Sequence, residues 1–222
     1  HAPEGDVRSL IGKSPKQIKE YGIALSFVPE DRLGMGLVGS MGMTENMMLK
    51  TYGEGSSPFV NKAPSKELAE DLKGGLSIVT PDISTPVRQL SGGNVQKDLE
   101  VVTPSTTFPV RRMSGGNVQK VLVGREISAA PSVLMTAYAV RGLDINTSYL
   151  IYDLLNEQKK KGVSVVFVGE DLDVMLALCD RIMVLCGGKV NGIIDGRSAT
   201  KEEVGMLMTN LTDKKEEVGY EN

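Results

Sequence analysis

The residues with the clearest chemical potential in this sequence are two identical glycine turns. Ser-Gly-Gly-Asn-Val-Gln-Lys is spelled at 91–97 and again at 114–120. A Ser-Gly-Gly at the start of a helix offers unpaired backbone N–H groups, the positive end of the helix dipole, and no Cβ atom that would block a phosphate. Each turn is therefore a candidate anion site, although the same tripeptide is also ordinary turn and helix-cap chemistry.

The segments that follow the two turns indicate which of them begins a helix. After the second turn, the chain continues through Val121, Leu122 and Ile127 at helical spacing. After the first turn it meets Thr103 and Pro104, which stop a helix after about two turns. We therefore expect the second copy to start a helix that leads into a strand, and the first copy to lie in an exposed loop or a short satellite helix.

One tandem duplication over about 80–120 explains the two copies, because TPDISTPVRQL and TPSTTFPVRRM also match ahead of the glycines. Extra loop length costs only about 0.6 kcal/mol per doubling, so the fold can place the added segment on its surface. The second copy, which is the predicted site, comprises Ser114, Gly115, Gly116 and Asn117. The first copy, which we expect to be unused, comprises Ser91, Gly92, Gly93 and Asn94.

Composition excludes several classes of function. The 222 residues are 41% hydrophobic, which is enough to bury a core. Lys plus Arg is 25 against 28 for Asp plus Glu, so a formal net charge of -3 gives no reason to expect a nucleic acid partner. The only histidine is His1, so no internal imidazole can act as a base or a metal ligand. Cys179 and Cys186 fit neither a disulfide framework nor a metal site, and no run reaches the roughly 18 apolar residues of a membrane span.

Strand-like apolar runs alternate with helix-period segments along the chain. The predicted strands are 23–28, 132–136, 163–168, 181–186 and 189–194, the last two joined by a Gly-Gly turn. The predicted helices are 44–50, 65–73, 118–127, 147–161, 171–179 and a last one that begins at 200. We expect Ser65 to cap its helix, and Thr200 with Glu203 to form a capping box. The alternation predicts an α/β fold with a mostly parallel sheet, covered by helices on both faces, and a hairpin at its end.

Four segments occur in an order and spacing that resemble a known family. They are GIALSFVPEDR at 22–32, RRMSGGNVQKVLVGRE at 111–126, VRGLD at 140–144 and VVFVGEDLDVMLALCDRIMVL at 165–185. Over about 5–210 the chain resembles the ATP-binding subunit of ABC transporters, specifically the second half of the tandem ATP-binding proteins of simple-sugar and nucleoside importers. The resemblance implies a P-loop NTPase-like nucleotide-binding domain over 1–210 that lacks the N-terminal phosphate-loop segment. It also implies a small helical subdomain over about 44–115, and a charged tail follows at 211–222.

Site roles follow from the resemblance where residues match. The second glycine turn matches the ABC signature, which in the family binds the γ-phosphate of ATP held by the opposite subunit. Only one of the two copies can lie at the interface between the subunits. The segment that matches the D-loop comprises Arg141, Gly142, Leu143 and Asp144. Glu30 stands at the position of the Q-loop glutamine, at the joint with the helical subdomain. The alternative for residues 30–32 is a solvated turn.

The chain departs from the family at every position that would hydrolyse ATP. No Gly-x-x-x-x-Gly-Lys-Ser/Thr loop is present, and the Gly-Lys-Ser at 12–14 lacks the upstream glycine and precedes Pro15. The sequence resembles the part of the family that follows that loop. Ala137 and Tyr138 stand where the family has the Asp that orders Mg²⁺ and the Glu that polarises water, and Glu170 stands at the switch histidine. We therefore expect no catalytic residue and no metal site in the chain itself.

The sequence thus predicts a non-catalytic ATP-binding component of an ABC importer for simple sugars or nucleosides. ATP and Mg²⁺ would be met only through a partner half, and the expected partners are another nucleotide-binding domain and membrane permease subunits, at the inner face of the cell membrane. One alternative is an active ATPase half whose phosphate loop lies in a missing upstream segment. A second is a remnant or interaction protein with no nucleotide role.

A cluster of methionines after the Q-loop position allows two interpretations. Clustered Met can form an adaptable apolar surface, here toward the membrane subunit, or it can fill the core. The cluster comprises Met35, Met41, Met43, Met47 and Met48.

Overall fold

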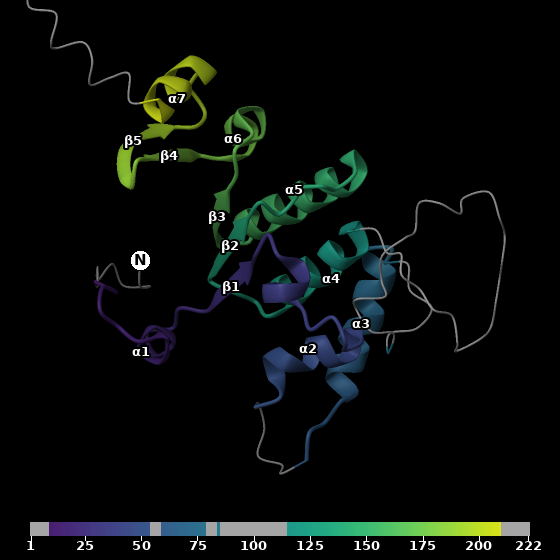
Figure 1. Cartoon of the computed structure of the whole chain (residues 1–222). Coiled ribbons are helices and arrows are strands. Elements are labelled where there is room, and N and C mark those ends of the chain that lie inside the picture. Colours follow the sequence, from purple (N-terminus) through teal and green to yellow (C-terminus); the bar gives the residue numbers. More distant parts are fainter. Residues whose placement is uncertain (1–8, 54–58, 79–83, 85–114, 210–222) are drawn as a thin grey trace, which may run out of the picture. The chain divides into compact units, whose positions relative to one another are not determined.

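The computed structural model describes residues 9–53, 59–78, 84 and 115–209, and the chain divides into two units, 1–166 and 167–222 (Figure 1). Three expectations fall on residues outside the described ranges: the first glycine turn at 91–94, most of the duplication, and the charged tail. Ser114 of the second glycine turn also lies outside them.

The first unit is built on a three-stranded sheet with the order β1-β2-β3. Its strands are β1 (Leu25–Val28), β2 (Val133–Ala137) and β3 (Ser164–Val168), and β3 reaches the boundary between the units. β1 and β2 are parallel, with Leu25 opposite Val133. The predicted α/β class with parallel pairing is confirmed.

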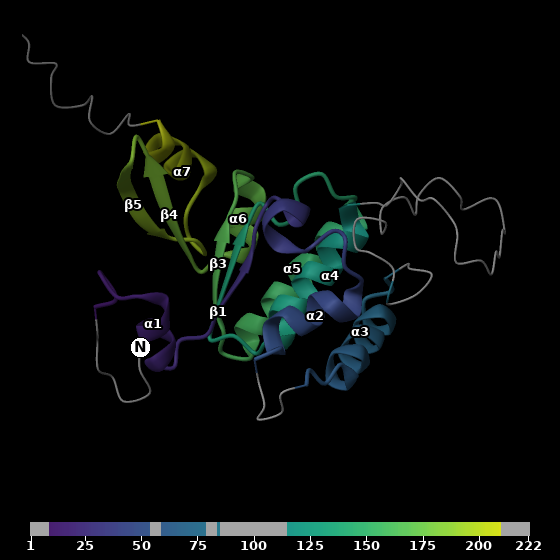
Figure 2. The same ribbon diagram turned by 60° about the horizontal axis from the view of Figure 1, so that its bottom comes forward.

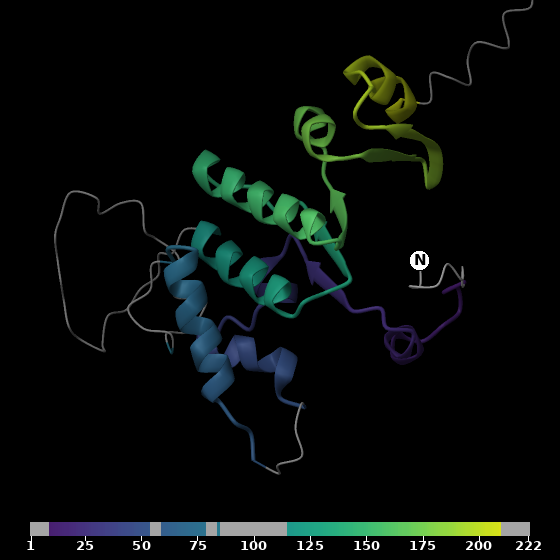
Figure 3. The same cartoon turned by 180° about the vertical axis from the view of Figure 1, so that it is seen from behind.

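Two long helices flank this sheet and lie side by side, α4 (Gly115–Ser128) and α5 (Ile145–Lys160) (Figure 3). Val121 and Leu122 of α4 and Ile151 of α5 are fully buried. The helix predicted after the second glycine turn is therefore confirmed, and so is the apolar face that packs it on the sheet.

The opposite side of β1 differs from the expectation of a sheet covered on both faces. Ser26 and Val28 are buried, but Leu25 and Phe27, which alternate with them, are 59% and 37% exposed. Within the described residues of the first unit, β1 is covered on one face only, so cover of the second face stays a prediction.

A pair of shorter helices, α2 (Met43–Thr51) and α3 (Ala63–Gly75), packs together in the same unit (Figure 2). Met43 and Met47 are fully buried, so core filling is the role of these two methionines, whereas Met35 is 73% exposed. A Cβ atom at Gly124 of α4 would come within 2.8 Å of a Leu72 methyl group of α3, so a larger residue there would require the Leu72 side chain to shift.

The predicted cap of α3 is wrong. Ser65 is buried inside the helix, and Lys62 precedes its first residue. Pro64 explains the earlier start, because its fixed φ favours the first turn of a helix.

Two short elements were not predicted. Helix α1 (Pro15–Glu20) begins with a capping box in which the Ser14 hydroxyl accepts from the Gln17 N–H at 3.3 Å. Ser14 is thus a helix cap, in keeping with the rejection of Gly-Lys-Ser as a phosphate loop. A π-helical turn, η1 (Arg32–Gly36), follows β1 and is capped by Asp31.

The second unit is a small α/β module. It contains α6 (Leu172–Leu178), the antiparallel strands β4 (Arg181–Cys186) and β5 (Lys189–Asp195), and α7 (Lys201–Met208). Ile182, Val184 and Val204 form its core. The predicted hairpin and the capping box of Thr200 and Glu203 are confirmed. No helix in the described residues of either unit is both long and apolar enough to cross a membrane.

Candidate functional site

The start of α4 lies against the start of α5. The helix begins at Gly115, directly after Ser114, and Asn117 is buried. A Cβ atom at Gly116 would lie 3.1 Å from Thr147 Oγ1 and 3.6 Å from Asp144 Oδ2. The structure therefore brings the predicted signature helix and the end of the predicted D-loop into contact, and glycine provides the room for it.

Asp144 ends the predicted D-loop segment and caps α5. Its carboxylate accepts the Thr147 backbone N–H at 3.0 Å and the Thr147 hydroxyl at 2.8 Å. These hydrogen bonds, the backbone one foremost, hold the pKa of Asp144 below its ordinary value. Gly142, two residues earlier, has φ +69°, a left-handed conformation that favours glycine.

We predict that Asp144→Ala destabilises the protein by about 1 kcal/mol at neutral pH, because a helix N-cap is lost. A lowered folded-state pKa gives stability that is complete above the ordinary aspartate pKa of about 3.9 and is lost as the pH falls through the folded-state value. The difference in the free energy of unfolding between Asp144→Ala and wild type should therefore shrink in acid. Urea unfolding at neutral pH and in acid measures it. Asp144→Asn is the control, because it keeps the cap without the charge. An alanine effect that persists unchanged in acid would contradict this role.

Glu30 and Arg141 form an ion pair, with 2.7 Å between Glu30 Oε1 and Arg141 Nη1. Their side chains are 48% and 61% exposed. The structure thus joins the predicted Q-loop position to the predicted D-loop. An exposed pair of this kind contributes only about 0–1 kcal/mol.

Arg32 lies beside this pair and donates hydrogen bonds to α4 and to the loop between β2 and α5. Its Nε donates to Gln119 Oε1 of α4 at 2.7 Å, and its Nη2 donates to the Arg141 carbonyl at 2.5 Å. Neither Arg32 nor Gln119 was among the predicted site residues. The only sequence signal was their position inside two of the four segments that carry the family resemblance, 22–32 and 111–126.

The segment after β2 lacks the groups that would activate water. β2 ends at Ala137, Tyr138 adopts a left-handed φ of 50°, and Ala139 is buried. No residue of 137–140 carries a carboxylate. Glu170, the residue at the predicted switch position, is exposed and belongs to the second unit, so it is not placed relative to the start of α4.

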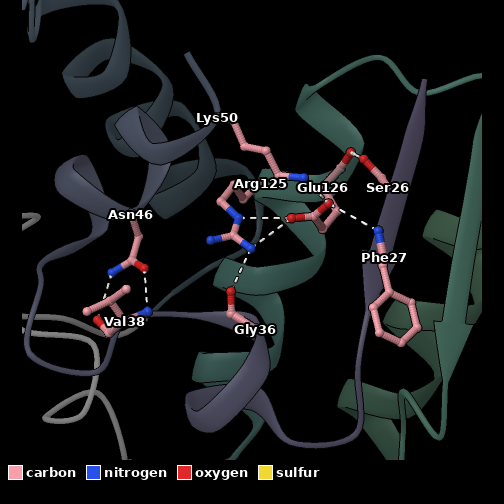
Figure 4. Close-up of polar contacts among 8 residues, drawn as sticks. All are labelled: Ser26, Phe27, Gly36, Val38, Asn46, Lys50, Arg125 and Glu126. Carbon is pink, nitrogen blue, oxygen red and sulfur yellow. Dashed lines mark hydrogen bonds and ion pairs between the residues drawn. The ribbon is translucent and has the colours of Figure 1, made fainter. Parts of the chain in front are cut away.

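A buried charge cluster missed by the sequence analysis holds α4 to β1 and α2 (Figure 4). The Glu126 carboxylate, 1% exposed, accepts from Arg125 Nη2 at 2.8 Å, from Lys50 Nζ at 2.7 Å and from the Phe27 N–H at 3.2 Å. The Ser26 hydroxyl donates to the Glu126 carbonyl at 2.8 Å, and Arg125 Nη2 also donates to the Gly36 carbonyl at 2.7 Å. Glu126 therefore links the two helices to the first strand of the sheet.

Asn46 fixes the loop between η1 and α2 in the same region (Figure 4). Its side chain accepts the Val38 N–H at 2.9 Å and donates to the Val38 carbonyl at 3.1 Å and the Gly42 carbonyl at 3.0 Å. The residue is fully buried, so these bonds replace water for its amide.

Comparison with known proteins confirms the predicted resemblance. The chain is 32% identical over 199 residues to the xylose import ATP-binding protein of Moorella thermoacetica, covering 90% of this chain and 34% of that protein. It is 30% identical over 206 residues to the guanosine import ATP-binding protein of Bacillus subtilis, covering 90% of this chain and 35% of that protein. The chain thus spans about a third of the length of these relatives. No protein-family model matches it.

Solved structures confirm the fold. A dimeric bacterial ABC transporter cassette matches 84% of this chain and 69% of its own length, with a TM-score of 0.60 at 18% identity. The cbiO1 protein of Clostridium perfringens, part of an ABC transporter complex, matches 89% of this chain and 67% of its own length, with a TM-score of 0.56 at 16% identity. The chain therefore has the fold of an ABC nucleotide-binding cassette.

Proposed function

We propose that this relative of ABC importer ATP-binding proteins is a non-catalytic half that presents the start of α4 to a phosphate of ATP held by a partner half. The observation that carries the proposal is the pairing of an intact glycine start at Gly115 with a post-β2 segment, 137–140, that has no carboxylate. The first feature suits anion binding, and the second removes what would order Mg²⁺ and orient water.

The start of α4 suits an anion for physical reasons. Its first N–H groups have no partner within the helix, and the helix dipole places partial positive charge at that end. α4 is 14 residues long, so the dipole is well developed, and Gly115 at its start has no Cβ atom that would block a ligand. One helix terminus supplies only about 0.3–1 kcal/mol per charge contact, so most of the affinity for ATP must come from the partner.

The remaining parts of the proposal come from the relatives. Their names describe import of xylose, galactose, ribose or guanosine, so we propose simple sugars or nucleosides as the transported class. ATP and Mg²⁺ would be bound through the partner half. The partner halves would work on membrane permease subunits at the inner face of the cell membrane.

ATP-dependent association with an ATP-loaded nucleotide-binding half tests the proposal. Gly115→Asp should weaken that association at least tenfold, because a carboxylate would face the phosphate where N–H groups now point. Gly92→Asp in the first glycine turn is the matched control and should change nothing. Analytical ultracentrifugation with and without ATP measures both. Association that Gly92→Asp abolishes and Gly115→Asp spares would refute the assignment of the second copy.

A further inference from the structure

Arg32 makes hydrogen bonds to two segments: α4, whose start the proposed function directs toward the partner half, and the loop between β2 and α5. Nε reaches Gln119 in the second turn of α4, and Nη2 reaches the carbonyl of Arg141 in the loop between β2 and α5. We propose that Arg32 is a positioning residue that locks this loop to the start of α4, so that the two segments move as one body. The inference rests on the proposed function for its consequence, but its geometry is a property of the free chain.

Arginine suits this position because its guanidinium group has two separate donors in a fixed fork. The two acceptors belong to different elements, at 2.7 Å and 2.5 Å from different nitrogens. A lysine ammonium is one point charge on a flexible stem and cannot hold the same planar geometry. The contact therefore depends on the shape of the side chain and not only on its charge.

Gln119 is oriented by the same contact. Its side chain is fully buried, and its Oε1 must face Arg32 Nε, since the reversed amide would set two donors against each other. Its Nε2 has no hydrogen-bond partner among the described residues. A buried amide with an unsatisfied donor is costly, so the bond to Arg32 is the contact that compensates for burying Gln119.

Glu30 has a secondary part in this lock. Its ion pair with Arg141 is exposed on both sides, whereas the bond from Arg32 to Gln119 is partly buried and only the bond from Arg32 to the Arg141 carbonyl is exposed. Exposed pairs are screened by water and salt, and buried hydrogen bonds to a charged group are stronger. Arg32 should therefore carry most of the coupling, and Glu30 should adjust it.

The coupling has a direct consequence for the proposed site. The loop that contains Arg141 leads into Asp144, and Asp144 with Thr147 contacts the start of α4 at Gly116. With Arg32 in place, the loop is held to α4 at two points. Arg141 is linked through Arg32 to Gln119, and Asp144 contacts Gly116. A partner that moves the loop must then move the glycine start with it.

Hydrogen exchange of the free chain, read by mass spectrometry without nucleotide, tests the lock. The reporters are the backbone N–H groups of Arg141 and Leu143, which donate to the Tyr138 and Val140 carbonyls at 3.1 Å each.

Arg32→Ala should raise the exchange rate of these reporters at least tenfold. Arg32→Lys should raise it nearly as much, and Gln119→Met, which removes the acceptor on α4, should do the same. Glu30→Gln should give at most about a fivefold rise, in line with the roughly 0–1 kcal/mol of an exposed pair.

The control is Arg181→Ala, an exposed arginine on β4 of the second unit, which should leave the reporters unchanged. Rescue by Arg32→Lys would overturn the proposal, because charge alone would then suffice. An equal rise of exchange along all of α5 and β2 would overturn it too, since that is the signature of general destabilisation. If the unaltered chain showed no ATP-dependent association while exchange at these reporters followed the expected pattern, the proposed function would be contradicted. The positioning role of Arg32 would still stand.

Discussion

Glu126→Ala is expected to destabilise the protein by about 3–5 kcal/mol, the largest stability effect that the structure predicts. The carboxylate is 1% exposed and accepts hydrogen bonds from Arg125, Lys50 and the Phe27 backbone. Alanine would leave the Arg125 charge buried, with its side chain 8% exposed and without its carboxylate partner. Removing one member of a buried pair costs about 3–5 kcal/mol for this reason. Urea unfolding followed by circular dichroism measures the change.

Two control variants separate the possible causes of that loss. Glu157→Ala removes an exposed glutamate from α5 and should stay within about 0.5 kcal/mol of wild type. Glu126→Gln keeps the size and the acceptor oxygen but loses the charge, so it should fall between wild type and Glu126→Ala. An effect of Glu126→Ala as small as that of Glu157→Ala would mean that the cluster does not hold α4 to β1 and α2.

The purified chain with ATP and Mg²⁺ is expected to release no phosphate above background. Hydrolysis depends on a lysine and backbone cradle for the phosphates, a carboxylate for Mg²⁺ and a group that orients water. The sequence has no phosphate loop, and residues 137–140 are Ala, Tyr, Ala and Val. Turnover near the median enzyme rate of about 10 per second would contradict the proposed non-catalytic role.

Restoring the carboxylates makes this expectation sharper. The double variant Ala137→Asp, Tyr138→Glu should remain inactive, because the charges alone supply neither phosphate binding nor positioning. If the wild-type chain hydrolysed ATP when a polypeptide that carries a phosphate loop but no catalytic carboxylates was added, the alternative of an active half would be favoured, because the added polypeptide cannot hydrolyse ATP by itself. The double variant and the wild-type chain, each with and without that polypeptide, therefore distinguish the two functions.

Local patterns in the sequence predicted most elements of the fold. Val121 and Leu122 at helical spacing predicted the buried face of α4, and the apolar runs predicted the five strands found in the described residues. The misses have local causes as well. Pro64 marks a start of α3 ahead of Ser65, and Ser14 with Gln17 spells the capping box of α1.

The candidate site was only partly within reach of the sequence. Motif resemblance selected Gly115, Glu30 and Arg141, but it could not show that Arg32 bonds to Gln119, which lies 87 positions away. It could not show either that Phe27 meets Glu126 across 99 positions. Such contacts depend on the register in which helices meet strands, and periodicity describes each element without its neighbours.

The one-sided cover of β1 has a consequence for handling the protein. Among the described residues, Leu25 and Phe27 are exposed on a strand at the edge of its sheet, a combination that promotes adhesion between molecules. Such adhesion grows with protein concentration and is independent of how firmly each molecule is folded. Aggregation through this face is therefore expected to limit the concentration that the purified chain reaches. A mild detergent or a polar residue at position 25 should raise that concentration.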